Sequence, residues 1–166
     1  MFCEKLVVRS SKSADMDEIA ALHRDGYGRE NEADIALMML YSDTPTLSLV
    51  ADCDSGVIGH ILLTEIQAPV KAMMLSPLAV NGKFRELQVG STLVRHALKS
   101  AAKRKFEAIF VPGDPLFYER FGFSSASADA FSVKWKGPRF LAVELKDNAL
   151  SSKKGKIEVP EAFSGL

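Results

Sequence analysis

A strand–loop–helix junction in the middle of the chain could bind a negatively charged group. The apolar run ending in Leu78, Ala79 and Val80 leads into a loop, and the loop opens directly into an amphipathic helix. The first backbone amides of a helix have no partner within it and lie at the positive end of its dipole, which favours an anion by about 0.3–2 kcal/mol. Gly90 would let a phosphate approach the backbone closely, and Arg85 would add a fork of donors. An ordinary junction, with Gly90 present for packing, is the alternative that these residues leave open.

The junction differs from the two common nucleotide-binding loops. The sequence G-x-x-x-x-G-K-[ST] of a P-loop does not occur in the chain. A Rossmann fingerprint has three glycines and starts a doubly wound sheet, which this segment does not match. We therefore expect an anion site of another kind.

The hydrophobic pattern predicts the elements that must position this junction. Apolar or alternating runs predict strands at 6–8, 47–53, 57–66, 72–80, 107–111, 139–145 and 157–159. Apolar residues at helical spacing predict helices from about 16 to 26, 31 to 41 and 116 to 121. Another helix is predicted after Asn81-Gly82, with an apolar stripe at Leu93, Val94, Ala97, Leu98 and Ala101. This order predicts a mixed α/β fold with a mostly antiparallel sheet, flanking helices and one parallel strand pair.

Two local features refine this prediction. Pro77 removes a ladder donor, so the strand that contains it should bulge or splay there. Asp15 is followed three residues later by Glu18, which predicts a capping box at the start of the first helix.

Composition limits the classes of function. The chain has 166 residues with 21 basic and 21 acidic side chains, which fits one domain and argues against a dedicated nucleic-acid binder. No apolar run reaches the length of a signal peptide or a membrane span. Cys3 and Cys53 stand far apart without metal-ligand spacing, so we expect free thiols in a reducing compartment and a cytoplasmic protein without membrane or metal partners.

A second motif follows the junction by about thirty residues. Residues 117–123 read F-Y-E-R-F-G-F, and the junction itself contains R-E-L-Q-V-G-S at 85–91. With V-I-G-H at 57–60 and F-L-A-V-E-L at 140–145, the chain resembles the GNAT superfamily of N-acetyltransferases over nearly its full length. The F-Y-E-R-F-G-F block is the most specific part of the resemblance.

The resemblance implies a single domain over 1–166 that transfers an acetyl group from acetyl-coenzyme A (acetyl-CoA) to a primary amine. In the family, the strand end splays from its neighbour and pairs with the pantetheine arm, while the turn amides hold the diphosphate. The implied cofactor-binding positions are Leu78, Ala79, Val80, Arg85, Gln88, Val89, Gly90 and Ser91. Tyr118 would protonate the departing thiolate and also contact the cofactor, because a phenol of pKa about 10 is protonated at neutral pH.

One position departs from the family pattern. The family usually has glycine where this chain has Gln88. A positive φ would cost a glutamine about 1–2 kcal/mol, whereas a normal helical conformation would let it offer its own amide donor. The sequence leaves both conformations open, and with them the strength of coenzyme A binding.

The general base is harder to identify. An alkyl amine of pKa about 10 arrives charged and must lose a proton before it attacks the thioester. Glu65, acting through water, and His60 on the same strand are the candidates. The structural alternatives are an exposed charge at a strand end for Glu65 and a satisfied buried histidine for His60. Trp135 and Arg139, which follow the last loop, are not base candidates; they would border the acceptor pocket or serve only in packing.

Other functions remain open at this stage. A non-catalytic module that senses acyl-CoA would keep the fold without turnover, and a fold relative could bind another phosphate-bearing ligand. The acceptor could be a polyamine, an amino acid, an antibiotic or a protein amine. Pairing of C-terminal strand edges would give a homodimer, which the sequence does not decide.

Overall fold

The computed structural model describes residues 3–54, 56–134 and 140–165, without the side chains of Arg85 and Glu86. None of the helices in these ranges is both long and apolar enough to cross a bilayer.

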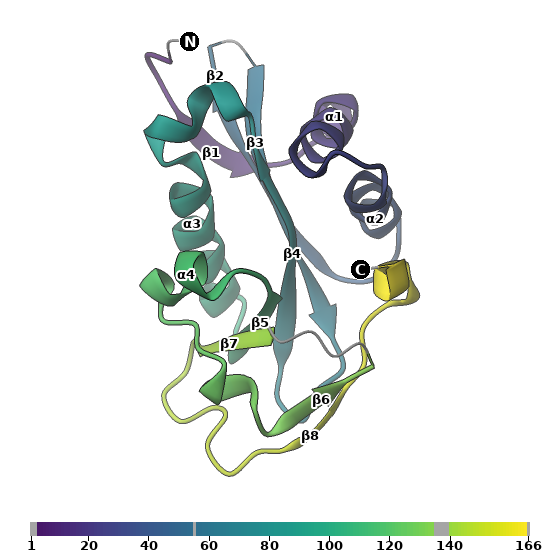
Figure 1. The fold of residues 1–166 in the computed structure, drawn as a ribbon, viewed down its shortest axis with the longest axis vertical. Helices are drawn as coiled ribbons and strands as arrows, with labels where there is room; N and C mark the ends of the chain where they lie inside the picture. Colours follow the sequence, from purple (N-terminus) through teal and green to yellow (C-terminus); the bar gives the residue numbers. More distant parts are fainter. Residues whose placement is uncertain (1–2, 55, 135–139, 166) are drawn as a thin grey trace. The chain divides into compact units, whose positions relative to one another are not determined.

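The described chain contains both strands and helices, labelled in Figure 1. The strands are β1 (Val7–Ser10), β2 (Thr46–Cys53), β3 (Gly56–Ile66), β4 (Ala72–Val80), β5 (Ala108–Pro112), β6 (Phe131–Val133), β7 (Phe140–Glu144) and β8 (Gly155–Ile157). The α-helices are α1 (Met16–Tyr27), α2 (Asn31–Leu40), α3 (Val89–Lys103) and α4 (Pro115–Tyr118). Short 3-10 helices are η1 (Ser13–Asp15), η2 (Gly82–Leu87), η3 (Glu119–Phe121), η4 (Ala126–Ala128) and η5 (Glu161–Gly165).

The strands form a mixed sheet, as the sequence predicted. Hydrogen-bonded neighbours follow the order β1-β2-β3-β4-β5-β7, and β6 and β8 make a separate two-stranded sheet. β4 and β5 are parallel, whereas β5 and β7 are antiparallel, as are β1 and β2. The predicted parallel pair within a mostly antiparallel sheet is therefore confirmed.

The pairing between β4 and β5 is short. Its register covers Ala72 to Met74 on β4 and Ala108 to Phe110 on β5. Both strands continue past this point, but no further β4–β5 pair occurs among the described residues of 64–76 and 98–166. The parallel ladder thus ends three residues before Pro77, where the sequence predicted a bulge or splay.

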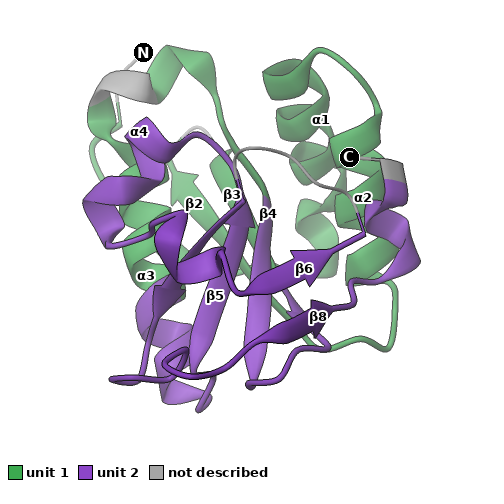
Figure 2. Cartoon of the chain, turned by 60° about the horizontal axis from the view of Figure 1, so that its bottom comes forward, with its two compact units in different colours: residues 1–63, 77–97 green, residues 64–76, 98–166 purple. Residues whose placement is uncertain are grey.

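The chain divides into two compact units (Figure 2). Unit 1 comprises residues 1–63 and 77–97, and unit 2 comprises 64–76 and 98–166. The single-domain expectation stays a prediction.

Within unit 1, helices cover both faces of the strands (Figure 1). Gly59 on β3 faces α3, because a Cβ added there would lie 2.9 Å from Val89 Cγ1 and 3.0 Å from Leu93 Cδ1. The next residue, His60, points to the opposite face and contacts His23 on α1. Successive side chains of a strand alternate between faces, so α1 and the start of α3 pack on opposite sides of β3.

The capping box predicted at Asp15 and Glu18 is wrong. Asp15 precedes α1 but makes no side-chain cap to that helix. Its carboxylate instead accepts hydrogen bonds from Arg9 and from the Lys12 backbone amide. Glu18 lies in the first turn of α1, but its side chain bonds outside the helix, because Oε2 accepts the Val57 N–H at 3.0 Å. Tertiary partners have replaced the local pairing that the spacing suggested.

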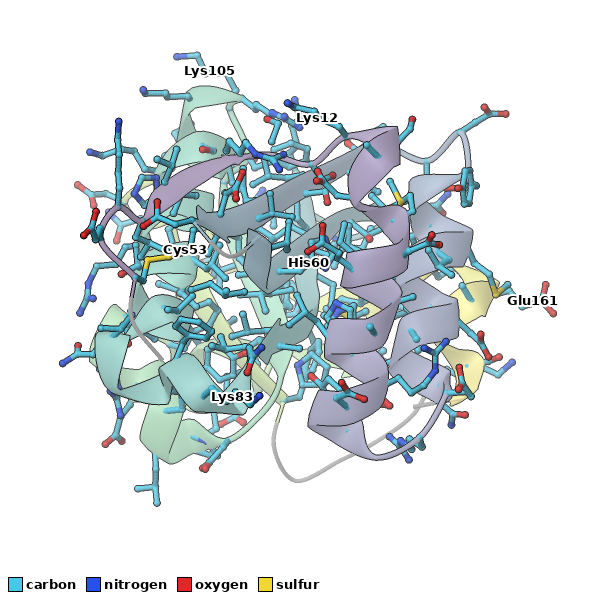
Figure 3. The ribbon with its side chains drawn as sticks, turned by 90° about the horizontal axis from the view of Figure 1, so that it is seen from above. Lys12, Cys53, His60, Lys83, Lys105 and Glu161 are labelled. Atoms are coloured by element: carbon cyan, nitrogen blue, oxygen red, sulfur yellow. A yellow bond between two sulfur atoms is a disulfide. The ribbon has the colours of Figure 1, made fainter. Side chains whose placement is uncertain are left out.

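The expectation of two free thiols is also wrong. Cys3 and Cys53 form a disulfide with a Cα–Cα distance of 5.9 Å, inside the usual range. The antiparallel register of β1 and β2 aligns Val7 with Asp52, which brings the segment before β1 to the end of β2. Spacing along the sequence could not reveal this proximity, because it depends on strand register. Figure 3 shows the sulfur of Cys53 in this bond.

Candidate functional site

The turn between β4 and α3 is anchored at its start. The Asn81 backbone amide donates to the Ile58 carbonyl at 2.8 Å, and the Asn81 carbonyl accepts the Phe84 amide at 2.9 Å. The Asn81 side chain accepts the Lys83 amide at 3.0 Å, and the Phe84 ring is buried. These bonds fix the path of η2 toward the helix.

Gln88 has a left-handed backbone conformation. Its φ is +54°, so the first of the two conformations left open by the sequence is the one adopted. A non-glycine residue in this region costs about 1–2 kcal/mol, and residues strained in this way cluster at functional sites. The Gln88 side chain is exposed, whereas the side chain of the next residue, Val89, is buried.

Helix α3 starts directly after this residue. The Thr92 amide and the Thr92 hydroxyl both donate to the Gln88 carbonyl at 3.0 Å, which ties the first turn of the helix to Gln88. The amides of Val89, Gly90 and Ser91 precede that bond, in the positions where a helix has no internal acceptor. Val89 and Ser91 are buried and Gly90 is half-buried, so the predicted diphosphate-binding amides are positioned by packing.

A pocket of about 410 Å³ adjoins this turn in unit 1. It is lined by the end of β4 and the turn on one side and by α1 and the start of β3 on the other: Val80, Asn81, Gly82, Lys83, Glu18, Ala21, Leu22, Asp25, Gly26 and Val57. Of the predicted cofactor positions, it includes Val80. Lys83 brings a cation and Glu18 and Asp25 bring carboxylates to its wall.

The backbone of Leu78 is contacted by a side chain that the sequence reasoning missed. The Tyr27 hydroxyl donates to the Leu78 carbonyl at 2.9 Å and accepts the Leu78 amide at 3.4 Å. Gly26, one residue earlier, brings α1 against β4, since a Cβ there would lie 3.4 Å from the Ala79 Cβ. No motif in the sequence signals this contact.

The F-Y-E-R-F-G-F block forms α4 and η3 in unit 2. Asp114 caps α4, accepting the Leu116 amide on its side chain at 3.0 Å, and Pro115 occupies the first turn. Gly122 ends η3 with a φ of +92°, which confirms the predicted stop. A short aromatic helix is therefore built where the motif predicted one.

Tyr118 is the last residue of α4 and only 8% of its surface is exposed. Its ring contacts those of Phe117 and Phe123 edge to face, with centroids 4.9 and 5.5 Å away. A Cβ added to Gly113 would lie 2.4 Å from Tyr118 Cε2, so only glycine leaves room for the ring. The packing holds the phenol ring in one position.

His60 is fully buried and its two ring nitrogens are both hydrogen bonded. Nδ1 lies 2.7 Å from His23 Nε2, and Nε2 lies 2.8 Å from the Ser48 hydroxyl, which in turn accepts from Ser11. Figure 3 shows His60 beside α1. Loss of hydration lowers the pKa of His60 well below 6.5, and the neighbouring His23 lowers it further. This environment matches the structural alternative considered for His60.

The histidine pair predicts a loss of stability in mild acid. Burial lowers the pKa of His23 to about 4, although Glu32 acts in the opposite direction. Between pH 6.5 and 4 the unfolded histidine binds a proton and the folded one does not, so the free energy of unfolding falls as pH falls. His23 alone should account for about 3 kcal/mol over this range, and His60 adds to the same trend.

Urea unfolding at pH 7, 6, 5 and 4.5 measures this trend. His96→Gln, at an exposed position, is the control for replacing a histidine outside the buried pair. A free energy of unfolding that stays constant from pH 6.5 to 4.5 would contradict the assignment of a neutral buried pair.

The other predicted site residues are Glu65, Arg85, Trp135 and Arg139. Glu65 is half-buried on β3, in the part of that strand that belongs to unit 2. The side chain of Arg85, together with Trp135 and Arg139, lies outside the described residues. Unit 1 thus brings together the strand-end and turn positions predicted to bind a cofactor, and unit 2 holds Tyr118 and Glu65. Among the described residues no cluster of three or more side chains could hold a metal ion.

Comparisons of sequence point to one family. Residues 15–123 match the Acetyltransferase (GNAT) family. YhbS of Escherichia coli K12, described as an uncharacterized N-acetyltransferase, is 30% identical over 165 residues, which cover 96% of this chain and 99% of YhbS. YjhQ of the same strain, described in the same words, is 29% identical over 70% of this chain and 68% of its own length.

Solved structures agree with this result. A crystal structure of YhbS from Escherichia coli in complex with CoA superposes with a TM-score of 0.91 at 30% identity, covering 96% of this chain and 92% of that one. A GNAT acetyltransferase from Brucella melitensis in complex with acetyl-CoA has a TM-score of 0.80 at 21% identity, covering 96% and 98%. The second likeness concerns the fold alone. With the matched motifs, the strained turn before α3 and the relatives in agreement, the chain belongs to the Acetyltransferase (GNAT) family.

Proposed function

We propose that this protein transfers the acetyl group of acetyl-CoA to a primary amine. The observation that carries the proposal is the start of α3, where the amides of Val89, Gly90 and Ser91 lie in the first turn, just before the bond from Thr92 to the Gln88 carbonyl. Three successive N–H groups at a helix start are a suitable partner for a diphosphate. The CoA and acetyl-CoA complexes of the two related structures support this assignment.

The proposed cofactor residues lie in this turn and in the strand before it. Gln88 bends the chain so that the next three amides start the helix, and Arg85 is the proposed additional donor to the diphosphate. The backbone of Leu78, Ala79 and Val80 is the proposed partner of the pantetheine amides, because it continues beyond the short β4–β5 ladder.

The proposed chemistry needs one base and one acid. Glu65 accepts a proton from the ammonium group through a water molecule, which leaves a neutral amine. The amine nitrogen then attacks the thioester carbon, and the C–S bond breaks as Tyr118 donates its proton to the sulfur. The nitrogen loses its extra proton as the amide forms, and that proton returns through solvent to the Tyr118 oxygen. We assign the base to Glu65 rather than to His60, since both ring nitrogens of His60 have partners in a buried site.

A ligand screen followed by a turnover assay tests the proposal. Melting temperatures are compared with acetyl-CoA, CoA, ATP and NAD, and ligand at 100 times its dissociation constant should add about 2.7 kcal/mol. For a chain of this size that corresponds to a rise of about 5–10 °C. Thiol release is then followed with polyamines, amino acids, aminoglycosides and a lysine peptide.

The outcomes separate the proposed function from its rivals. Stabilisation by acetyl-CoA and CoA with thiol release for one amine class supports acetyl transfer. Binding without release across the whole panel would favour an acyl-CoA sensor instead. Stabilisation by ATP or NAD alone would overturn the cofactor assignment.

We further propose that the protein works in the cytoplasm, where its proposed cosubstrate is made. The expectation of free thiols no longer supports this location, because Cys3 and Cys53 are joined. Cytosolic reductants keep most thiols reduced, so the pair would cycle with the redox state there.

A further inference from the structure

A tyrosine hydroxyl from α1 is bonded to the peptide groups of β4. Tyr27 is the last residue of α1, and its hydroxyl contacts both backbone polar groups of Leu78. The N–H and C=O groups of a strand residue normally pair with a neighbouring strand or with a ligand. At Leu78 a side chain of the same unit has taken that place.

The two bonds differ in quality. The Tyr27 hydroxyl lies 2.9 Å from the Leu78 carbonyl oxygen, but the Leu78 nitrogen lies 3.4 Å from the same hydroxyl. Hydrogen bonds from backbone N–H groups are usually 2.9–3.0 Å long, so the amide is only weakly engaged. The Tyr27 hydroxyl therefore makes a stronger hydrogen bond to the Leu78 carbonyl than to the Leu78 amide.

The ring that carries this hydroxyl is accessible. Tyr27 is 42% exposed, whereas its hydroxyl lies among protein atoms, and this loss of hydration raises its pKa. The group therefore stays protonated at neutral pH and donates to the Leu78 carbonyl. Because Tyr27 is partly exposed and ends α1, the hydroxyl can leave Leu78 without unfolding the helix.

We infer that Tyr27 is a placeholder for the cofactor: its hydroxyl satisfies the Leu78 backbone in the free protein and yields it when the pantetheine arm binds. This inference rests on the proposed function, because it takes Leu78 to be a cofactor-binding position. An amide of the pantetheine arm offers the same donor and acceptor as the hydroxyl, so the two exchange at one backbone site. Tyr27 is thus a positioning residue that acts through Leu78.

Exchange has a thermodynamic consequence that a purely structural contact lacks. If the bond exists only in the free protein, its removal destabilises the free form and not the bound form. The net contribution of one such hydrogen bond changes an equilibrium constant by about fivefold. Tyr27→Phe should therefore bind CoA about fivefold more tightly than wild type.

The experiment compares two phenylalanine variants by calorimetric titration with CoA and by melting with and without saturating CoA. Tyr27→Phe should lower the melting temperature of the free protein by about 2–4 °C and leave that of the saturated protein nearly unchanged. Tyr41→Phe is the matched control, since Tyr41 is 73% exposed and follows α2. It should change neither affinity nor melting temperature.

Each outcome is decisive. Tighter binding by Tyr27→Phe, with the loss of stability confined to the free protein, supports the placeholder role. Equal or weaker CoA binding by Tyr27→Phe overturns the inference, as does an equal loss of stability in its free and bound forms. In either case, CoA binding by the wild-type protein leaves the proposed function standing. Absence of CoA binding to every variant overturns the proposed function and this inference with it.

Discussion

A Tyr118→Phe variant is expected to lose acetyl transfer by about 100-fold or more while still binding CoA. Removal of a positioned general acid typically costs a factor of 10²–10⁴ in rate. The thiolate would then leave without a proton donor, and the acyl-transfer step would become slow. The rate of thiol release with the best amine of the panel, together with CoA titration, measures both properties.

The structure makes this substitution a specific one. Phenylalanine keeps the ring, and with it the edge-to-face contacts to Phe117 and Phe123 and the close packing on Gly113. Only the hydroxyl is lost, so the fold should persist. Tyr41→Phe should retain full turnover. A Tyr118→Phe enzyme with wild-type turnover over the neutral and alkaline range would remove the proposed acid.

Removal of the disulfide is expected to be the largest change in stability. Cys3 and Cys53 are separated by 50 residues, and closing a loop of this length in the unfolded chain corresponds to about 4 kcal/mol in the loop-entropy account. Cys3→Ser should therefore lower the free energy of unfolding by that amount and the melting temperature by about 10 °C. Cys3 is the better site to change, because it is half-buried and Cys53 is buried.

Reductant provides the control for this prediction. Dithiothreitol should lower the stability of the wild-type protein to that of Cys3→Ser and should have no effect on the variant. Equal stability of the oxidised and reduced wild-type protein would contradict the assigned stabilisation. Thiol counting under denaturing conditions establishes which form is present in each sample.

Much of the fold could be predicted because its signals are local. The apolar run at 72–80 and the helical stripe through Leu93 and Ala97 are each contained in a short stretch of sequence, and both elements form where expected. β6 was missed because three residues, Phe131 to Val133, are too few to show a period. Its parallel partner β8 lies more than twenty residues later, so no turn marked the pair.

The candidate site was predictable only in part. The Gly90 turn and Tyr118 belong to motifs, but Tyr27 reaches Leu78 from another element, 51 residues away in sequence. The pairing of His23 with His60 spans 37 residues and has no spacing rule of its own. Contacts of this kind depend on how α1 packs against β3 and β4, which a local pattern does not contain.

Gln88 shows how a departure from a family pattern is resolved by structure. The sequence left open a left-handed or a helical conformation, with opposite consequences for its side chain. A φ of +54° shows that the fold retains the turn without glycine. The buried Phe84 and Val89 on either side supply the packing that holds this conformation.

The central claim is that the start of α3 binds the diphosphate of the cofactor, and the backbone amide signals of ¹⁵N-labelled protein test it most directly. On titration with CoA, the largest chemical-shift changes should fall on Val89, Gly90 and Ser91. Pantetheine, which lacks the diphosphate, should leave these three amides unchanged. Saturation with CoA that moves other amides but not these would contradict the account.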